Sequence, residues 1–347
     1  MGWGMKAFWD PIQLTHAPQF FLQRGQLRSS VEVPGRAESL LAGCRALGLD
    51  IVAPPSPDRA ALEAVHGTAY LDWLRDAPAA WAALEDAGAE IVPNIHPPPE
   101  MLASGARPAE SPIGRAGWFT ADTSCPVGPH TWPAALAAAA CALAAADEAA
   151  VGRDSYALAR PPGHHAYPGR AGGHCYLNNA ALAAERLRAK GARRVAILDI
   201  DSHHGNGTQG VFWHRDDVLY ASVHGDPSGY YPWYTGYADE LGAGAGAGCN
   251  RNFPLAAGTG DLGWLAALDA AVRAVSRFTP DALVVSLGFD ASRDEPLRFL
   301  DVSDDGFARA GAAIGKLDLP AAFIQEGGYN TERLGKVLEL FFGAFGG

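Results

Sequence analysis

The chain has 347 residues, of which 48% are apolar and 19% are charged, and its formal net charge at pH 7 is −11. This composition supports a large hydrophobic core and excludes a mainly disordered chain. The negative net charge argues against nucleic acid as a partner, because phosphate binding requires clustered lysine and arginine side chains.

The cysteines and the N-terminal residues bear on the compartment. The five cysteines are an odd number and form no C-x-x-C pair, which favours a reducing interior over a disulfide framework. The first residues, MGWGMKAFWDP, lack the basic and apolar regions of a signal peptide, and no apolar run reaches membrane-spanning length. We therefore expect a cytoplasmic protein that has no membrane partner.

The predicted elements alternate between helix and strand. Segment 92–132 is rich in proline, glycine and serine, and we expect an elaborated loop there, inserted in one domain that spans residues 1–347. Short apolar runs then predict buried strands at 156–159, 195–200, 218–223, 282–287 and 321–325. Helical patterns lie between and after them, at 180–191, 262–278 and 306–317. This alternation is typical of an α/β domain whose central parallel sheet carries helices on both faces.

Polar residues follow each of these predicted strands. His164 and His165 come after the first strand, DIDSHHGNG (199–207) ends the second, and His224 follows the third. Asp290 follows the fourth strand, and Tyr329 lies just beyond the fifth. Because open α/β sheets bind ligands at the carboxyl ends of their strands, the pattern predicts a functional site at this edge.

The spacing within DIDSHHGNG points to a metal ion. Asp199, Asp201 and His203 lie on one side of an extended segment, since residues two apart share a side. Two carboxylates and an imidazole in this arrangement need a cation, and their oxygen and nitrogen donors suit Zn²⁺, Fe²⁺ or Mn²⁺. A catalytic zinc site needs three protein ligands and an open position. Asp201 and His203 are two candidates, and Asp290 is a candidate third.

Several longer motifs resemble those of one known family. RPPGHHA, AGGHCYLNNAA, LDIDSHHGNGTQ, SLGFD and EGGY occur in the order found in the zinc-dependent deacetylases, which include histone deacetylases and bacterial acetylpolyamine amidohydrolases. RPPGHH and HHGNGTQ look most like the class II and acetylpolyamine branch. The resemblance covers most of the chain and implies a single arginase-like α/β domain with an eight-stranded parallel sheet.

The resemblance also implies roles for five residues in amide hydrolysis. His164 and His165 match the tandem catalytic histidines of the family, and Tyr329 matches the tyrosine that polarises the substrate carbonyl. Asp199 matches the acid bonded to the first histidine. Asn206 matches the position that orients the second histidine.

Two cation sites are implied by the same resemblance. The zinc ligands would be Asp201, His203 and Asp290, with Fe²⁺ as the alternative metal. A structural potassium site would include Asp199, Ser222 and Val223.

The substrate tunnel departs from the family pattern. His174 stands where the family usually has phenylalanine or tyrosine, and Ile113 stands where acetylpolyamine enzymes carry a glutamate. The tunnel residues expected by rough alignment are Gly173, His174, Ile113, Trp118, Phe119 and Phe21. This apolar lining favours a small neutral or aromatic N-acyl amide as substrate over a polyamine.

Three alternatives to that substrate class stay open. They are an acetylpolyamine amidohydrolase, a protein acetyl-lysine deacetylase and a non-catalytic protein that binds acyl ligands. Segment 92–132 resembles the insertion through which acetylpolyamine enzymes dimerise at the tunnel entrance. We therefore expect a homodimer that acts on a small-molecule amide.

Overall fold

A sheet of eight parallel strands forms the centre of the computed structural model, which describes residues 4–346. Residues 1–3 and 347 of the predicted domain, and with them the start of the N-terminal stretch, lie outside the described residues. In spatial order the strands are β4 (Asp50–Val52), β1 (Lys6–Phe8), β5 (Ser155–Ala157), β10 (Ala321–Gln325), β9 (Ala282–Leu287), β6 (Val195–Asp199), β7 (Val218–Gly225) and β8 (Asn250–Leu255). The predicted fold class is confirmed.

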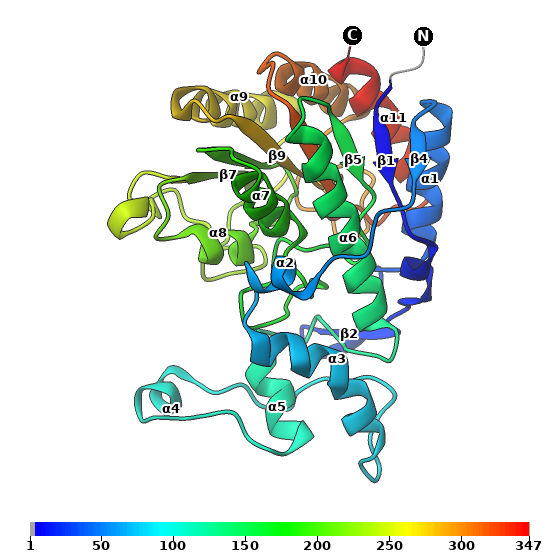
Figure 1. Cartoon of the computed structure of the whole chain (residues 1–347), viewed down its shortest axis with the longest axis vertical. Helices are drawn as coiled ribbons and strands as arrows, with labels where there is room; N and C mark the ends of the chain where they lie inside the picture. The colour runs from blue at the N-terminus through cyan, green and yellow to red at the C-terminus, as the bar shows by residue number, and fades with distance from the viewer. Residues whose placement is uncertain (1–3, 347) are drawn as a thin grey trace.

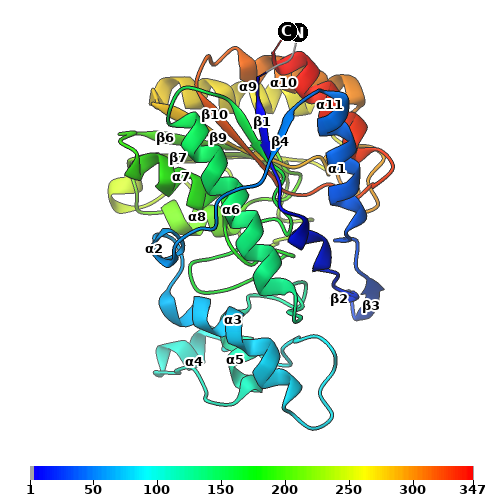
Figure 2. The same cartoon turned by 45° about the vertical axis from the view of Figure 1, so that its right-hand side comes forward.

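Helices cover both faces of the sheet (Figures 1 and 2). One face carries α6 (Thr131–Ala149) and α7 (Asn179–Ala189), and the other carries α1 (Gly35–Ala46), α9 (Asp261–Phe278), α10 (Asp304–Gly315) and α11 (Leu334–Phe345). Side chains alternate along β6, so that Val195 and Ile197 enter the first core while Ala196 and Leu198 enter the second. Burial on both faces explains why this strand reads as a continuous apolar run.

Segment 92–132 is more regular than the predicted loop. It contains α4 (Pro99–Ala103) and α5 (Pro112–Phe119), and α6 begins at its end. α5 packs against α3 (Thr68–Ala82), and Figures 1 and 2 show α3, α4 and α5 together at the end of the molecule away from the chain termini. The short α2 (Arg59–Glu63) precedes α3, and α8 (Asn206–Phe212) follows β6.

A hairpin outside the main sheet carries one of the predicted tunnel residues. β2 (Phe20–Gln23) and β3 (Gln26–Ser29) pair in antiparallel fashion around Arg24 and Gly25, which both have positive φ (51° and 72°). Two left-handed residues are what a tight two-residue hairpin turn requires. The hairpin brings Phe21 to the wall of the cavity described below.

Among residues 4–346, no helix is both long and apolar enough to cross a bilayer.

Candidate active site

Three predicted metal ligands meet at the carboxyl ends of adjacent strands. Asp201 follows β6, and Asp290 follows the neighbouring β9. His203 Nδ1 lies 3.1 Å from Asp201 Oδ1 and 2.9 Å from Asp290 Oδ2. The three donor atoms lie within 4.8 Å of one another, and the side chains are almost fully buried. Two carboxylates and one imidazole at these separations fit the ligand set of a divalent ion such as zinc.

The charges of these three side chains also favour a bound cation. Burial lowers the pKa of His203, but the charges of Asp290 and Asp201 outweigh it and raise that pKa to about 9. Burial and the charge of Asp201 raise the pKa of Asp290. A proton on His203 therefore balances part of the charge in the metal-free protein, and metal binding would release it.

Main-chain groups hold the two carboxylates in place. Asp201 Oδ2 accepts a hydrogen bond from the N–H of Gly327 (2.7 Å), and Asp290 Oδ1 accepts one from the N–H of Ser202 (2.7 Å). Gly327 and Gly288 approach the carboxylates so closely that a Cβ at either position would overlap an Asp201 oxygen. Glycine at these two strand ends is what lets the backbone reach the trio.

The tandem histidines are oriented by different partners. His164 Nδ1 lies 3.0 Å from Asp199 Oδ2, which also accepts a hydrogen bond from the Tyr220 hydroxyl (2.9 Å). His165 Nδ1 lies 2.6 Å from Asn206 Oδ1. Because that oxygen can only accept, His165 donates from Nδ1 and keeps Nε2 free as an acceptor.

The surroundings of the two imidazoles give them different protonation states. The pKa of His164 is lowered by burial, but the charges of Asp199 and Asp201 raise it to about 10 overall. Burial and the adjacent His164 and His203 hold the pKa of His165 well below its usual value. The metal-free site therefore contains one charged and one neutral imidazole with ring centroids 4.0 Å apart.

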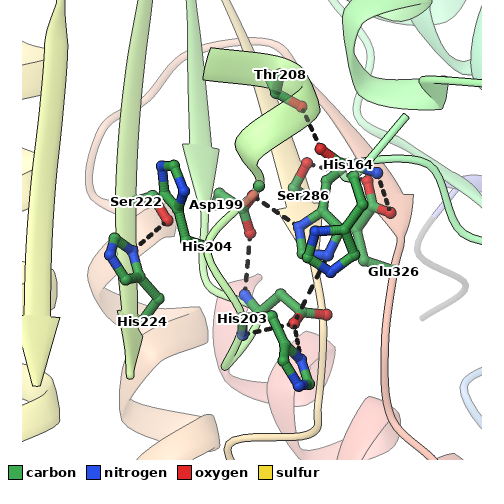
Figure 3. A network of polar contacts seen from close by, with 12 residues as sticks. His164, Asp199, His203, His204, Thr208, Ser222, His224, Ser286 and Glu326 are labelled. Atoms are coloured by element: carbon green, nitrogen blue, oxygen red, sulfur yellow. Dashed lines mark hydrogen bonds and ion pairs between the residues drawn. The ribbon is translucent and has the colours of Figure 1, made fainter. Parts of the chain in front are cut away.

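Glu326 is a member of this site that the spacing argument missed. Its Oε2 accepts hydrogen bonds from the N–H groups of Gly163 (2.7 Å) and His164 (3.1 Å), and its Oε1 accepts one from the Ser286 hydroxyl (3.2 Å). Figure 3 shows His164 flanked by Asp199 and Glu326. Burial raises the pKa of Glu326 to about 7. Its place in the EGGY motif was the only signal in the sequence.

The predicted potassium residues lie on neighbouring strands. Asp199 of β6 pairs in register with Ser222 of β7, and Val223 is the next residue. The Ser222 hydroxyl lies 2.8 Å from His224 Nδ1, and Figure 3 places His204 and His224 on the side of Asp199 away from His164. Potassium binding stays a prediction.

A cavity of about 410 Å³ reaches His203 of the trio. Its lining includes three predicted chemical residues, which are His165, His203 and Tyr329. It also includes the predicted tunnel residues Phe21, Gly173 and His174. Residues that the sequence did not indicate complete the wall, among them Ser124, Tyr230, Tyr231 and Phe299.

The other three predicted tunnel residues lie elsewhere in this chain and are absent from the cavity lining. Phe119 stacks on Trp73 with ring centroids 5.3 Å apart and belongs to the hydrophobic core. Trp118 packs against the same core, while Ile113 is 44% exposed on α5. The rough alignment overlooked that these positions form a helix directed at α3.

Asp122 joins two walls of the cavity. Its Oδ2 accepts hydrogen bonds from the Tyr231 hydroxyl (2.6 Å) and from the N–H of Gly173 (3.0 Å). The Tyr231 ring meets His165 edge-on at 4.9 Å, and His174 has φ of 66° beside Gly173. The aspartate thus ties the glycine turn to the tyrosine across the tunnel.

Tyr329 lines the same cavity as His165. It follows two glycines, of which Gly328 has φ of 118°, and the guanidinium of Arg36 lies 4.7 Å from the centre of its ring. Arg36 also donates hydrogen bonds to the carbonyls of Glu326 and Gly328. Burial raises the pKa of Tyr329 well above its usual value, which keeps the phenol protonated and able to donate.

Comparisons with known proteins agree with this geometry. A histone deacetylase domain model matches residues 30–345. An acetylpolyamine amidohydrolase of Burkholderia pseudomallei is 46% identical over 344 residues, which cover 99% of each chain. Acetylpolyamine amidohydrolase 1 of Pseudomonas aeruginosa is 44% identical over 92% of each chain. A crystal structure of acetylpolyamine aminohydrolase from Burkholderia pseudomallei matches with a TM-score of 0.95 at 45% identity, covering 99% of this chain and 98% of that one.

The residues at the strand ends, the sheet order and these matches lead to the same assignment. The chain belongs to the histone deacetylase family and is a hydrolase of amide C–N bonds.

Proposed function

We propose that this chain is a zinc-dependent deacylase of small N-acylated amines, with acetylated polyamines as the first candidate substrates. The observation that carries the proposal is the convergence of Asp201, His203 and Asp290 with His165 and Tyr329 on one cavity. This arrangement supplies metal ligands, a proton acceptor and an oxyanion donor from separate strand ends. Fe²⁺ is the alternative metal, because the same donors suit it.

The trio of Asp201, His203 and Asp290 would hold the metal. When bound, the ion would act as a Lewis acid on the amide carbonyl and would lower the pKa of a water molecule. The protein restricts access to the trio, because Asp201 and Asp290 are almost completely buried and His203 faces the cavity. Water and substrate therefore reach the same side of the trio.

Proton transfer falls to His165. The hydrogen bond to Asn206 leaves its Nε2 free to accept a proton from the attacking water, and it can then pass this proton to the leaving amine. His164 is held by Asp199, and in the metal-free protein the charges of Asp199 and Asp201 outweigh burial and raise its pKa to about 10. We propose that His164 stabilises the developing anion and keeps the pKa of His165 low.

Tyr329 would donate its hydroxyl to the carbonyl oxygen as negative charge develops there. A donor already aimed at that position does not need to reorganise during the reaction. The contact with Arg36 and the bonds from Arg36 to neighbouring carbonyls support its placement.

The names of the relatives support acetylated polyamines as substrates. Three proteins that match 90% or more of this chain at 40% to 46% identity are called acetylpolyamine amidohydrolases. They favour that alternative over the neutral or aromatic amide that the tunnel residues led us to expect. Within a single chain the part of that expectation based on Ile113 has no support, since this residue does not line the cavity.

A neutral N-acyl amide is the second candidate, for one specific reason. Within the described part of the chain, the cavity lining contains Arg24 and Arg298 but no aspartate or glutamate. A polycation would gain no direct ion pair from this wall. Asp122, which accepts a hydrogen bond from the Tyr231 hydroxyl, is one carboxylate outside the metal trio that the lining residues contact.

A homodimer formed through segment 92–132, a cytoplasmic location and a structural potassium ion remain proposals. The exposed apolar side chains Ile95, Met101, Leu102 and Ile113 of this segment support the dimer. The protein-deacetylase alternative has weaker support, since the relatives named as histone deacetylases match 62% to 63% of this chain. The ligand-binding alternative has weaker support because every proposed catalytic position is filled.

A substrate screen tests the proposed function. Zinc-loaded protein would be assayed for acetate release from acetylated diamines and polyamines, acetyl-lysine peptides and neutral aryl acetamides. We expect the highest kcat/KM for acetylated amines of the polyamine class. A preference for aryl acetamides would establish the second candidate, and inactivity towards all of them would contradict the proposal.

A further inference from the structure

Glu295 is a buried carboxylate that has no role in the reaction described so far. It lies in the loop after β9, five residues beyond Asp290, and its exposed fraction is 7%. Its Oε1 and Oε2 accept hydrogen bonds from the main-chain N–H of Tyr329 (3.0 and 2.9 Å). Oε1 also accepts the N–H of Asn330 (3.0 Å). These two main-chain N–H groups are the partners of the carboxylate.

The surroundings of Glu295 provide little other compensation for its charge. Burial and the charge of Asp290 raise its pKa to about 7, while the N–H groups and Arg36 act in the opposite direction. Tyr230 also faces it and remains protonated. Within residues 4–346, no lysine or arginine lies within ion-pair distance of this carboxylate. Burying a carboxylate is unfavourable unless it is hydrogen-bonded. The hydrogen bonds of Glu295 all reach one short segment.

The segment around Tyr329 is held by hydrogen bonds on both sides of the tyrosine. Tyr329 follows Gly327 and Gly328, whose missing side chains leave the backbone free to turn. On one side of the tyrosine, Arg36 bonds to the carbonyls of Glu326 and Gly328. On the other side, Glu295 takes the N–H groups of Tyr329 and Asn330. The Asn330 side chain also donates to the carbonyl of Asp294 (2.8 Å).

We propose that Glu295 is a positioning residue for Tyr329, which holds the tyrosine main chain so that the phenol faces the metal ligands. The proposal rests on the proposed function, because it assigns Tyr329 the role of oxyanion donor. Glu295 reaches the reaction only through Tyr329. Its removal is therefore expected to impair catalysis without weakening the binding of metal or substrate.

A double-mutant cycle tests this role on the zinc-loaded full chain. The variants are Glu295→Gln, Tyr329→Phe and the double variant, with kcat and KM measured on the best substrate of the screen. Gln keeps the size of the side chain but turns an amide donor towards the N–H of Tyr329. We expect Glu295→Gln to lower kcat about 10- to 100-fold, because small misplacements of reacting groups have effects of this order. KM and zinc content should stay within about twofold.

Measuring the effect of Glu295→Gln in the Tyr329→Phe variant distinguishes a positioning role from a general structural effect. Without the phenol there is no hydrogen-bond donor for Glu295→Gln to misplace. The kcat of the double variant should therefore lie within about twofold of that of Tyr329→Phe. Glu295→Asp, which keeps the charge on a shorter side chain, should restore part of kcat. Glu332→Gln is the matched control, since this exposed glutamate lies three residues beyond Tyr329 and should leave kcat unchanged.

Several outcomes would overturn the inference. Equal losses from Glu295→Gln in the two backgrounds, or a rise in KM at unchanged kcat, would show that Glu295 does not act through Tyr329. If Glu295→Gln does not fold, the same cycle is run with Glu295→Asp. An inactive wild-type protein would instead overturn the proposed function, and this inference with it.

Discussion

At the residue scale, two adjacent histidines acquire opposite properties from their neighbours. His164 faces the carboxylate of Asp199, and its pKa rises to about 10. Burial and the charges of His164 and His203 lower the pKa of His165 well below the usual value, and the neutral amide of Asn206 does not offset them. The presence or absence of a neighbouring carboxylate thus decides which imidazole carries charge and which can accept a proton.

Exchanging that amide for a carboxylate tests the assignment of His165. In Asn206→Asp, a negative charge beside Nδ1 would favour the imidazolium and raise the pKa of His165. Since the protonated histidine cannot accept a proton, the acidic limb of the kcat/KM profile should move to higher pH. A pH–rate profile of the wild type and the variant measures this. An unchanged or downward-shifted limb would mean that His165 is not the base.

At the element scale, strand ends supply the site, and glycines allow them to converge. β6 and β9 are register partners, so the residues that follow them lie side by side. Gly288 directly follows β9, lies two residues before Asp290 and packs directly on Asp201. The distances between the metal ligands therefore depend on a residue that has no side chain.

Gly288→Ala should weaken metal binding. The added Cβ would overlap the Asp201 carboxylate and displace it, and disturbing the support of a ligand typically costs about 10–100-fold in metal affinity. Competition with a chromogenic chelator would measure the zinc Kd. Gly343→Ala in α11 is the control, because a Cβ there meets nothing within 4 Å. Equal affinities for all three proteins would refute this account of Gly288.

A second element-scale effect concerns stability at acid pH. His66 is 1% exposed, and its Nε2 accepts the N–H of Asn178, the residue that caps α7. Burial lowers the pKa of His66 from 6.5 to about 4. Because the unfolded chain binds a proton more readily, the stability from neutral His66 is complete above pH 6.5. It decreases as the pH falls towards 4.

The loss is about 2 kcal/mol between pH 7.5 and 5.0 for this one group. In His66→Gln, whose oxygen can accept the same N–H, nothing titrates at this position. Urea unfolding at the two pH values should therefore show a free energy of unfolding that falls about 2 kcal/mol less in the variant than in the wild type. Equal pH dependence in the two proteins would show that His66 is not buried in neutral form.

Sequence patterns predicted the strands that are buried along their whole length and missed those whose burial is mixed. The five predicted strands are all present, because central parallel strands read as continuous apolar runs. β1 and β4 have three residues each, too few to show a pattern, and β8 is partly polar. The metal trio was predictable because two ligands are close in sequence. The roles of Glu326, Tyr231 and Glu295 depend on the register of distant segments.

At the scale of the whole molecule, the residues that carry out the reaction and the residues that contact the substrate lie in different parts of the fold. The hydrolytic groups lie at the ends of the central strands, in a fold that is shared with a crystal structure 45% identical to this chain. The cavity mouth is formed by the β2–β3 hairpin and by loops near Tyr231 and Phe299. A rough alignment placed residues of α5 there, but within one chain that helix packs on α3.

The dependence of amide hydrolysis on the metal tests the central claim most directly. Acetate release from an acetylated diamine would be measured after chelation and after addition of one equivalent of zinc, for the wild type and for Asp290→Asn. We expect activity to be lost on chelation and restored by zinc in the wild type. In Asp290→Asn, it should stay at least about 100-fold lower. Full activity after verified metal removal, or zinc-restored activity of wild-type level in Asp290→Asn, would contradict the account.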